Sequence, residues 1–210
     1  MPMYQRDSSP FAPLPGTRPA PRGLFVHLWG TLAATNGDEP VRSLADVEFP
    51  LGAVNALFRA SRAGWCIYLL GNQPAVARGK VTPEDWTSFE SDLIGHLGEQ
   101  GVRVTRSYFC IDDPVHGVKG RQKDSVFHLP NTGAFYHAAH TDNVELRRSW
   151  VLGDTTEVLA AGWRAGVRMV GVKTGASLGD SSFEVTPDFV AADLREAVSE
   201  LLQLEGALHP

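Results

Sequence analysis

Short apolar runs alternate with helix-like segments along most of this chain, and this alternation restricts the fold more than any other feature. Five runs fit short strands: LFVHL (24–28), CIYLLG (66–71), VTRSYFC (104–110), SWVLGD (149–154) and RMVGV (168–172). Strands that read as apolar runs and are separated by helices are typical of a parallel sheet covered on both faces. The sequence therefore predicts an α/β fold, a three-layer sandwich with a parallel Rossmann-like sheet.

The segments between these runs carry helix signals. Residues 51–63 place apolar side chains at helical spacing, and Gly64 ends that helix. Thr82 and Pro83 supply an N-cap and a first-turn proline for a helix that continues to about Glu99. Two more helices are expected at 133–141 and 156–164. A last helix is expected to start at 186–188, with Val190, Leu194, Val198, Leu201 and Leu202 on its apolar face.

Composition limits the compartment and the partners. The formal net charge is −5 and no basic block occurs, so neither nucleic acid nor a membrane surface is an expected partner. No stretch approaches the roughly 18 apolar residues of a membrane span. The two cysteines lie in or at the end of apolar runs, which favours buried thiols and a cytoplasmic location. Residues 1–22 are rich in proline and are expected to form a flexible arm, followed by one domain over 23–207.

Ligands of parallel sheets bind at the carboxyl ends of the strands. In this chain those ends correspond to residues 27–31, 71–75, 110–130 and 154–158.

These four segments, in this order, resemble the four motifs of the haloacid dehalogenase (HAD) superfamily. The similarity is greatest to the cap-less branch that contains D-glycero-D-manno-heptose 1,7-bisphosphate phosphatase and histidinol phosphatase. GNQPAVARG (71–79) is similar to the family's Thr-Asn-Gln-Ser-Gly-Ile-Ala-Arg-Gly, and WVLGDTTEVLAAGWRAGV (150–167) is similar to its fourth motif. The resemblance covers about 23–174 and implies a cap-less HAD-like fold.

The chain departs from the family pattern at the positions that carry its chemistry. The resemblance implies that His27 replaces the Asp that attacks the phosphorus, and that Trp29 replaces the Asp that protonates the leaving oxygen. The phosphate-binding Thr falls on Gly71, the Lys on Leu129, and the second acid of the fourth motif on Val158, while Asp154 is kept. The large side chains of Trp29 and Leu129 are expected to fill the phosphate position. No catalytic residue is therefore expected at these five degenerate positions.

Metal sites are expected to be lost as well. The family's zinc loop, Cys-x-His followed by Cys-x-Cys, falls on Cys110, Asp112, Ser125 and Phe127, which keep one ligand of four, so no zinc is expected. Asp154 is a weak metal ligand if it is one at all. No cofactor is expected, and Mg²⁺ only if the protein is an active phosphatase.

The departures predict a catalytically degenerate homologue, a pseudoenzyme that acts as a binding, regulatory or structural subunit. A protein partner or self-association through the 1–22 arm or the 110–130 loop is expected. Two alternatives stay open. One is an active phosphomonoester hydrolase of a heptose bisphosphate-like sugar with a rebuilt site, in which His27 is the nucleophile or a basic side chain of the loop meets the phosphate. The other is a small-molecule binder that holds a sugar-phosphate-like ligand through Asn72, Gln73, Arg78 and Asp154.

Overall fold

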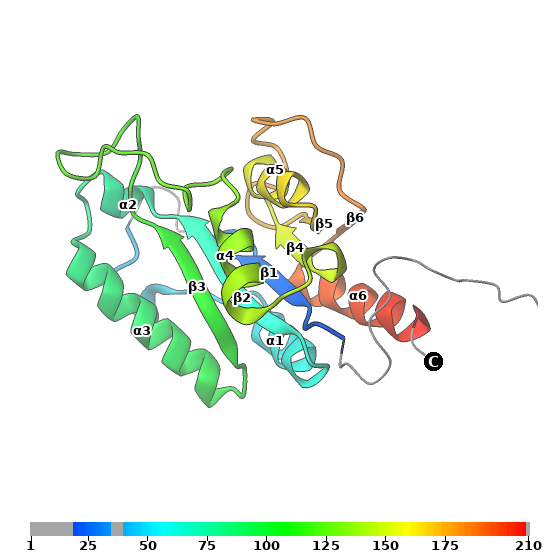
Figure 1. Ribbon diagram of the computed structural model, residues 1–210. Coiled ribbons are helices and arrows are strands. Elements are labelled where there is room, and N and C mark those ends of the chain that lie inside the picture. The colour runs from blue at the N-terminus through cyan, green and yellow to red at the C-terminus, as the bar shows by residue number, and fades with distance from the viewer. Residues whose placement is uncertain (1–18, 35–39, 209–210) are drawn as a thin grey trace, which may run out of the picture.

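A six-stranded parallel sheet forms the centre of the protein (Figure 1). The structure is a computed structural model that describes residues 19–34 and 40–208. The strand order is β3-β2-β1-β4-β5-β6, and all five neighbouring pairs are parallel. The strands are β1 (Gly23–His27), β2 (Cys66–Asn72), β3 (Val104–Cys110), β4 (Trp150–Gly153), β5 (Arg168–Val172) and β6 (Phe189–Ala191).

Helices cover both faces of this sheet. They are α1 (Ala53–Arg62), α2 (Pro74–Ala77), α3 (Pro83–Glu99), α4 (Gly133–Asp142), α5 (Thr156–Ala165) and α6 (Leu194–Leu208), with short 3₁₀ helices η1 (Leu44–Asp46) and η2 (Leu146–Arg148). Helices α1, α3 and α6 pack on one face, and α4 and α5 pack on the other (Figure 1). The predicted three-layer α/β fold is confirmed.

Strand β1 shows why apolar runs form this sheet. Leu24 and Val26 face the core under α1, α3 and α6, whereas Phe25 faces the core under α4 and α5. All three side chains are fully buried, because successive residues of a strand point to opposite faces and both faces are covered.

Two predicted helix N-termini, at Thr82 and near residue 156, are confirmed, and each has a side-chain cap. Thr82 Oγ1 accepts a hydrogen bond from the N–H of Asp85 at 3.0 Å, and Pro83 is the first residue of α3. Thr155 Oγ1 accepts from the N–H of Val158 in the same way at the start of α5. These caps satisfy backbone donors that a helix leaves unpaired at its first turn.

The last helix starts later than predicted. Residues 186–188 do not begin it, because Asp188 pairs with the backbone of Met169 beside β5 and the chain then forms the edge strand β6. Val190 lies on that strand and is 44% exposed, so it is not part of a helical core face. Helix α6 begins at Leu194, where Asp193 Oδ1 accepts from the N–H of Glu196 at 2.8 Å.

Residues 1–18 of the predicted arm lie outside the described residues, so the arm and the boundary at residue 22 stay predictions. Among the described residues, no helix is both long enough and apolar enough to cross a lipid bilayer.

Candidate active site

The candidate site lies at the carboxyl ends of β1, β2 and β4, where the strand order changes direction. Strand β1 lies between β2 and β4, and Val26 is in register with Leu152. The residues that follow, His27 on β1 and Asp154 after β4, therefore meet at one edge of the sheet. This is the place where ligands of parallel α/β sheets bind.

His27 and Asp154 form a buried pair. His27 Nδ1 lies 2.8 Å from Asp154 Oδ1, and Asp154 is only 2% exposed. Thr31 Oγ1 donates to the same oxygen at 3.1 Å, and the N–H of Ala176 donates to Oδ2 at 2.9 Å. Burial acts to raise the pKa of Asp154, but the hydrogen bonds from His27 and from the N–H of Ala176 act against it, and the pKa lies below its ordinary value. Asp154 is therefore an ionised acceptor that fixes the His27 ring.

Two glycines enclose this carboxylate. Gly30 and Gly175 both have positive φ angles, and a Cβ atom on either would collide with Asp154. Thr31 lies in a segment that the sequence singles out. Gly175 and Ala176 were missed, because they follow β5, whose carboxyl end was not included among the candidate segments, although it lies at the same edge of the sheet.

Trp29 does not act as a simple filler of the phosphate position. Its Nε1 donates to Gln73 Oε1 at 2.9 Å, and its ring stacks on Phe89 at a centroid distance of 6.0 Å. Gln73 is 3% exposed. The pair joins the turn after β1 to the end of β2. We refer to His27, Asp154, Trp29 and Gln73 as the strand-end cluster.

Leu129 and Asn72 hold the third motif in place. Asn72 Oδ1 accepts a hydrogen bond from the N–H of Leu129 at 2.9 Å, and Asn72 Nδ2 donates to the carbonyl oxygen of Leu129 at 3.2 Å. The Leu129 side chain is 1% exposed and packs in the core under α4 and α5. The expectation that it fills the phosphate position is therefore wrong, because its backbone is pinned so that the side chain enters the core.

The remaining predicted positions divide between core, edge and surface. Val158 is fully buried in the core, whereas its neighbour Glu157 is half-buried at the site. Asn72 Nδ2 lies 3.4 Å from Glu157 Oε2, and burial raises the pKa of Glu157 while His128 and His27 oppose the rise. The Arg78 side chain is exposed at the end of α2 and forms no ion pair or hydrogen bond with another described residue.

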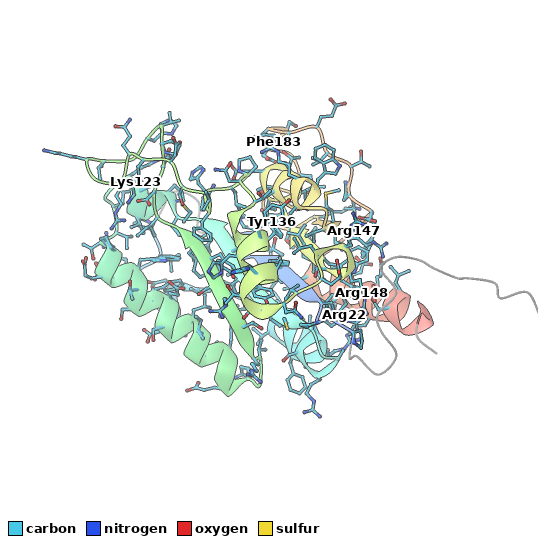
Figure 2. The ribbon with its side chains drawn as sticks, in the orientation of Figure 1. Arg22, Lys123, Tyr136, Arg147, Arg148 and Phe183 are labelled. Carbon is cyan, nitrogen blue, oxygen red and sulfur yellow. The ribbon has the colours of Figure 1, made fainter. Side chains whose placement is uncertain are left out.

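The loop over 110–127, here called the β3 loop, forms a separate region. The four positions of the family's zinc pattern, Cys110, Asp112, Ser125 and Phe127, line one cavity of about 300 Å³. Asp112 forms ion pairs with Arg121 at 3.3 Å and Lys123 at 3.5 Å. Figure 2 shows Lys123 on this loop, away from Phe183 on the loop that follows β5. The four zinc positions thus lie together, but the only ligand groups that they supply are the thiol of Cys110 and the carboxylate of Asp112, which is already in ion pairs.

The donor set does not fit a magnesium ion. Mg²⁺ prefers several oxygen ligands in near-octahedral geometry. Both oxygens of Asp154 already accept hydrogen bonds, and the described residues contain no group of three His, Cys, Asp or Glu side chains that could hold a metal. No step proposed below uses a metal ion. The absence of zinc stays a prediction.

Comparisons with known proteins agree with this fold. Residues 128–197 match the family model described as HAD-hydrolase-like. The chain is 26% identical over 161 residues to a D-glycero-β-D-manno-heptose-1,7-bisphosphate 7-phosphatase of Vibrio cholerae, covering 76% of this chain and 86% of the relative. It is 29% identical over 146 residues to the D-glycero-α-D-manno-heptose-1,7-bisphosphate 7-phosphatase of Burkholderia mallei, covering 70% and 76%.

A solved structure gives the same fold. The D,D-heptose 1,7-bisphosphate phosphatase from B. bronchiseptica, complexed with magnesium and phosphate, superposes with a TM-score of 0.75 at 22% identity, covering 87% of this chain and 99% of the other. The parallel sheet thus has a HAD-like fold. The chain resembles members of the HAD superfamily, and among them the D-glycero-D-manno-heptose 1,7-bisphosphate phosphatases.

These comparisons correct the functional prediction. The pseudoenzyme reading is wrong, because the relatives are named as phosphatases and nothing in the comparisons indicates a loss of catalysis. The alternative of an active phosphatase is the better supported one. The B. bronchiseptica phosphatase binds magnesium, which agrees with the prediction of Mg²⁺ for an active phosphatase. The prediction that no cofactor is needed finds no support in the comparisons.

Proposed function

We propose that this protein is a phosphomonoester hydrolase that acts on a phosphorylated sugar of the heptose bisphosphate kind, with His27 as its nucleophile. The observation that carries the proposal is the 2.8 Å contact between His27 Nδ1 and Asp154 Oδ1 at the switch point of the sheet. His27 stands at the position where the resemblance places the attacking carboxylate. The rebuilt site thus keeps a nucleophilic group at the end of β1.

The pairing leaves the outer nitrogen of His27 available for attack. An ionised carboxylate can only accept hydrogen bonds, so the proton of a neutral His27 ring lies on Nδ1 and the lone pair on Nε2. Nε2 lies 3.4 Å from the point that a Cβ atom of Gly71 would occupy. The His27 ring thus packs against the Gly71 backbone, where a Cβ atom would be in tight contact with it.

Glu157 supplies the proton in this proposal. Its half-buried carboxyl has a raised pKa, so it holds a proton closer to neutral pH than an exposed Glu does. In the first step the Nε2–P bond forms, the bond from phosphorus to the sugar oxygen breaks, and the Glu157 proton passes to that oxygen. In the second step Glu157 takes a proton from water, the hydroxide oxygen bonds to phosphorus, and the N–P bond breaks. Inorganic phosphate leaves and both side chains regain their starting states.

The test is phosphate release from D-glycero-D-manno-heptose 1,7-bisphosphate by the full chain, measured with Mg²⁺ and with EDTA. We expect turnover that falls to the buffer background in His27→Gln, because loss of the covalent nucleophile removes the pathway. His140→Gln is the matched control, since His140 is exposed on α4. Quenching during turnover should trap an acid-labile, base-stable phosphoprotein. Absence of phosphate release in wild type, or full activity in His27→Gln, would contradict the proposal.

We also propose that the protein associates with a protein partner or with a second copy through the 1–22 arm or the 110–130 loop. Light scattering of the full chain and of a chain starting at Gly23 tests this association. A cytoplasmic location is testable by fractionation of the native cells.

A further inference from the structure

Gln73 carries a buried donor that the structure leaves without a partner. The side chain is 3% exposed, and its Nε2 makes no hydrogen bond with any described residue. A buried amide donor without a partner is unfavourable, so such groups are uncommon in folded proteins. The backbone N–H of Gln73 is occupied, because it donates to the carbonyl oxygen of Cys110 at 2.7 Å. The side-chain amide is thus the group at this position that can receive a ligand.

Trp29 fixes which end of the amide faces the site. The indole N–H is only a donor, so it requires the carbonyl oxygen of Gln73, and the two atoms lie 2.9 Å apart. The NH₂ group must then point the other way. The stacking of Trp29 on Phe89 holds the indole, and through it the amide, in this orientation.

The unpartnered donor points to the same place as the nucleophile. The Cβ position of Gly71 lies 3.6 Å from Gln73 Nε2 and 3.4 Å from His27 Nε2. The two nitrogens therefore lie close together on the same side of the Gly71 backbone. A side chain at residue 71 would press on the His27 ring, and glycine avoids that contact.

We propose that Gln73 Nε2, oriented by Trp29, binds an oxygen of a tetrahedral oxyanion next to His27 Nε2. The inference rests on the proposed function for identifying the oxyanion as the phosphoryl group of the substrate and of the product. Gln73 is a binding residue here, and Trp29 is a positioning residue that acts through it. A donor held in place before the reaction stabilises charge on a phosphoryl oxygen without reorganising.

The experiment measures binding of inorganic phosphate, independently of turnover, by titration of the ¹⁵N-labelled full chain in NMR. We expect the Gln73 side-chain NH₂ resonances to move on addition of phosphate. Gln73→Met, a neutral variant of similar length, should weaken the phosphate Kd by about tenfold to a hundredfold, the value of a hydrogen bond to a charged group. Trp29→Phe, which keeps an aromatic ring beside Phe89, should weaken it by about threefold to tenfold.

Trp86→Phe is the matched control. Trp86 packs on the same Phe89 at a centroid distance of 5.2 Å, but its Nε1 has no hydrogen-bond partner among the described residues, so this variant disturbs the aromatic cluster and removes no hydrogen bond to Gln73. We expect an unchanged phosphate Kd. Equal Kd values in wild type and Gln73→Met, equal effects of Trp29→Phe and Trp86→Phe, or unmoved Gln73 resonances in wild type would overturn the inference.

The two proposals fail separately. Phosphate binding that depends on Gln73 in a chain without turnover would keep this inference and reject the proposed function. Turnover that depends on His27, with phosphate binding indifferent to Gln73 and Trp29, would do the reverse.

Discussion

The strand-end cluster and the β3 loop both depart from the family pattern, but they differ in how their replacements interact. In the strand-end cluster each replaced, partly buried residue pairs with a buried residue that the chain keeps, His27 with Asp154 and Trp29 with Gln73. In the β3 loop the corresponding positions contact solvent-facing partners, as in the ion pairs of Asp112 with Arg121 and Lys123. Buried polar pairs are costly unless each group is satisfied, whereas exposed ion pairs contribute little. The two regions thus differ in burial: the first ties the ends of three strands together, and the second presents its charged pairs to solvent.

The largest expected difference between the two regions is in turnover. Asp154→Asn keeps the shape of the side chain but allows the amide to donate to His27, which favours the tautomer with its proton on Nε2. We expect turnover to fall by about 10³–10⁴-fold, as for other catalytic His residues that lose their orienting carboxylate. The measurement is phosphate release from the heptose bisphosphate under the conditions of the His27 test.

Asp112→Asn is the partner variant in the β3 loop. It removes the same charge from an ion pair outside the strand-end cluster, so we expect turnover within about twofold of wild type. A loss as large as that of Asp154→Asn would break the comparison and assign the loop to the reaction.

A second test restores the metal pattern in the β3 loop. The triple variant D112H/S125C/F127C places a Cys-x-His and a Cys-x-Cys around the cavity that Cys110 already lines. We expect one tightly bound zinc per chain, stabilising the fold by about 2.7 kcal/mol when free zinc is a hundredfold above its Kd. Zinc content and melting temperature with and without chelator are the measurements. Stoichiometric zinc in the wild-type chain would show that the loop is a metal site as it stands.

The smallest expected effect is at a reference position away from both regions. Asp142 accepts from Arg106 Nε and Nη2, both at 2.9 Å, and from Tyr68 Oη at 3.1 Å. The hydrogen bond from Arg106 lowers the pKa of Asp142 below its ordinary value, although burial opposes this. A lowered pKa in the folded state stabilises the protein above the unfolded pKa of about 3.9, and this stabilisation is lost as the pH falls through the folded value.

Asp142→Asn should therefore lower the melting temperature at pH 7 by roughly 2–4 °C and leave turnover unchanged. The difference from wild type should shrink steadily below about pH 4 as Asp142 becomes protonated. Thermal melts at a series of pH values are the measurement. A difference that stays constant down to the acid limit would show that the carboxylate charge of Asp142 does not stabilise the fold.

The sequence by itself determined the sheet and most of its helices. The five predicted strands and the caps at Thr82 and Thr155 depend on periodicity and on local side-chain chemistry, which neighbouring residues fix. The edge strand β6 was missed, because three residues with Val190 exposed carry too little pattern, and a proline before them imitates a helix start.

The sequence also located the site, at the ends of the predicted strands, but only the tertiary structure decided what its residues do. His27 and Asp154 are 127 residues apart, and Trp29 and Gln73 are 44 apart, so no local pattern reveals either pair. Position by position, His27 and Trp29 indicate the loss of a nucleophile and of an acid. In the folded chain, parallel strands place their carboxyl ends side by side, so that His27 pairs with Asp154 and Trp29 holds the side-chain amide of Gln73. Whether a replaced residue is a loss or a substitute depends on the partner that the sheet brings to it.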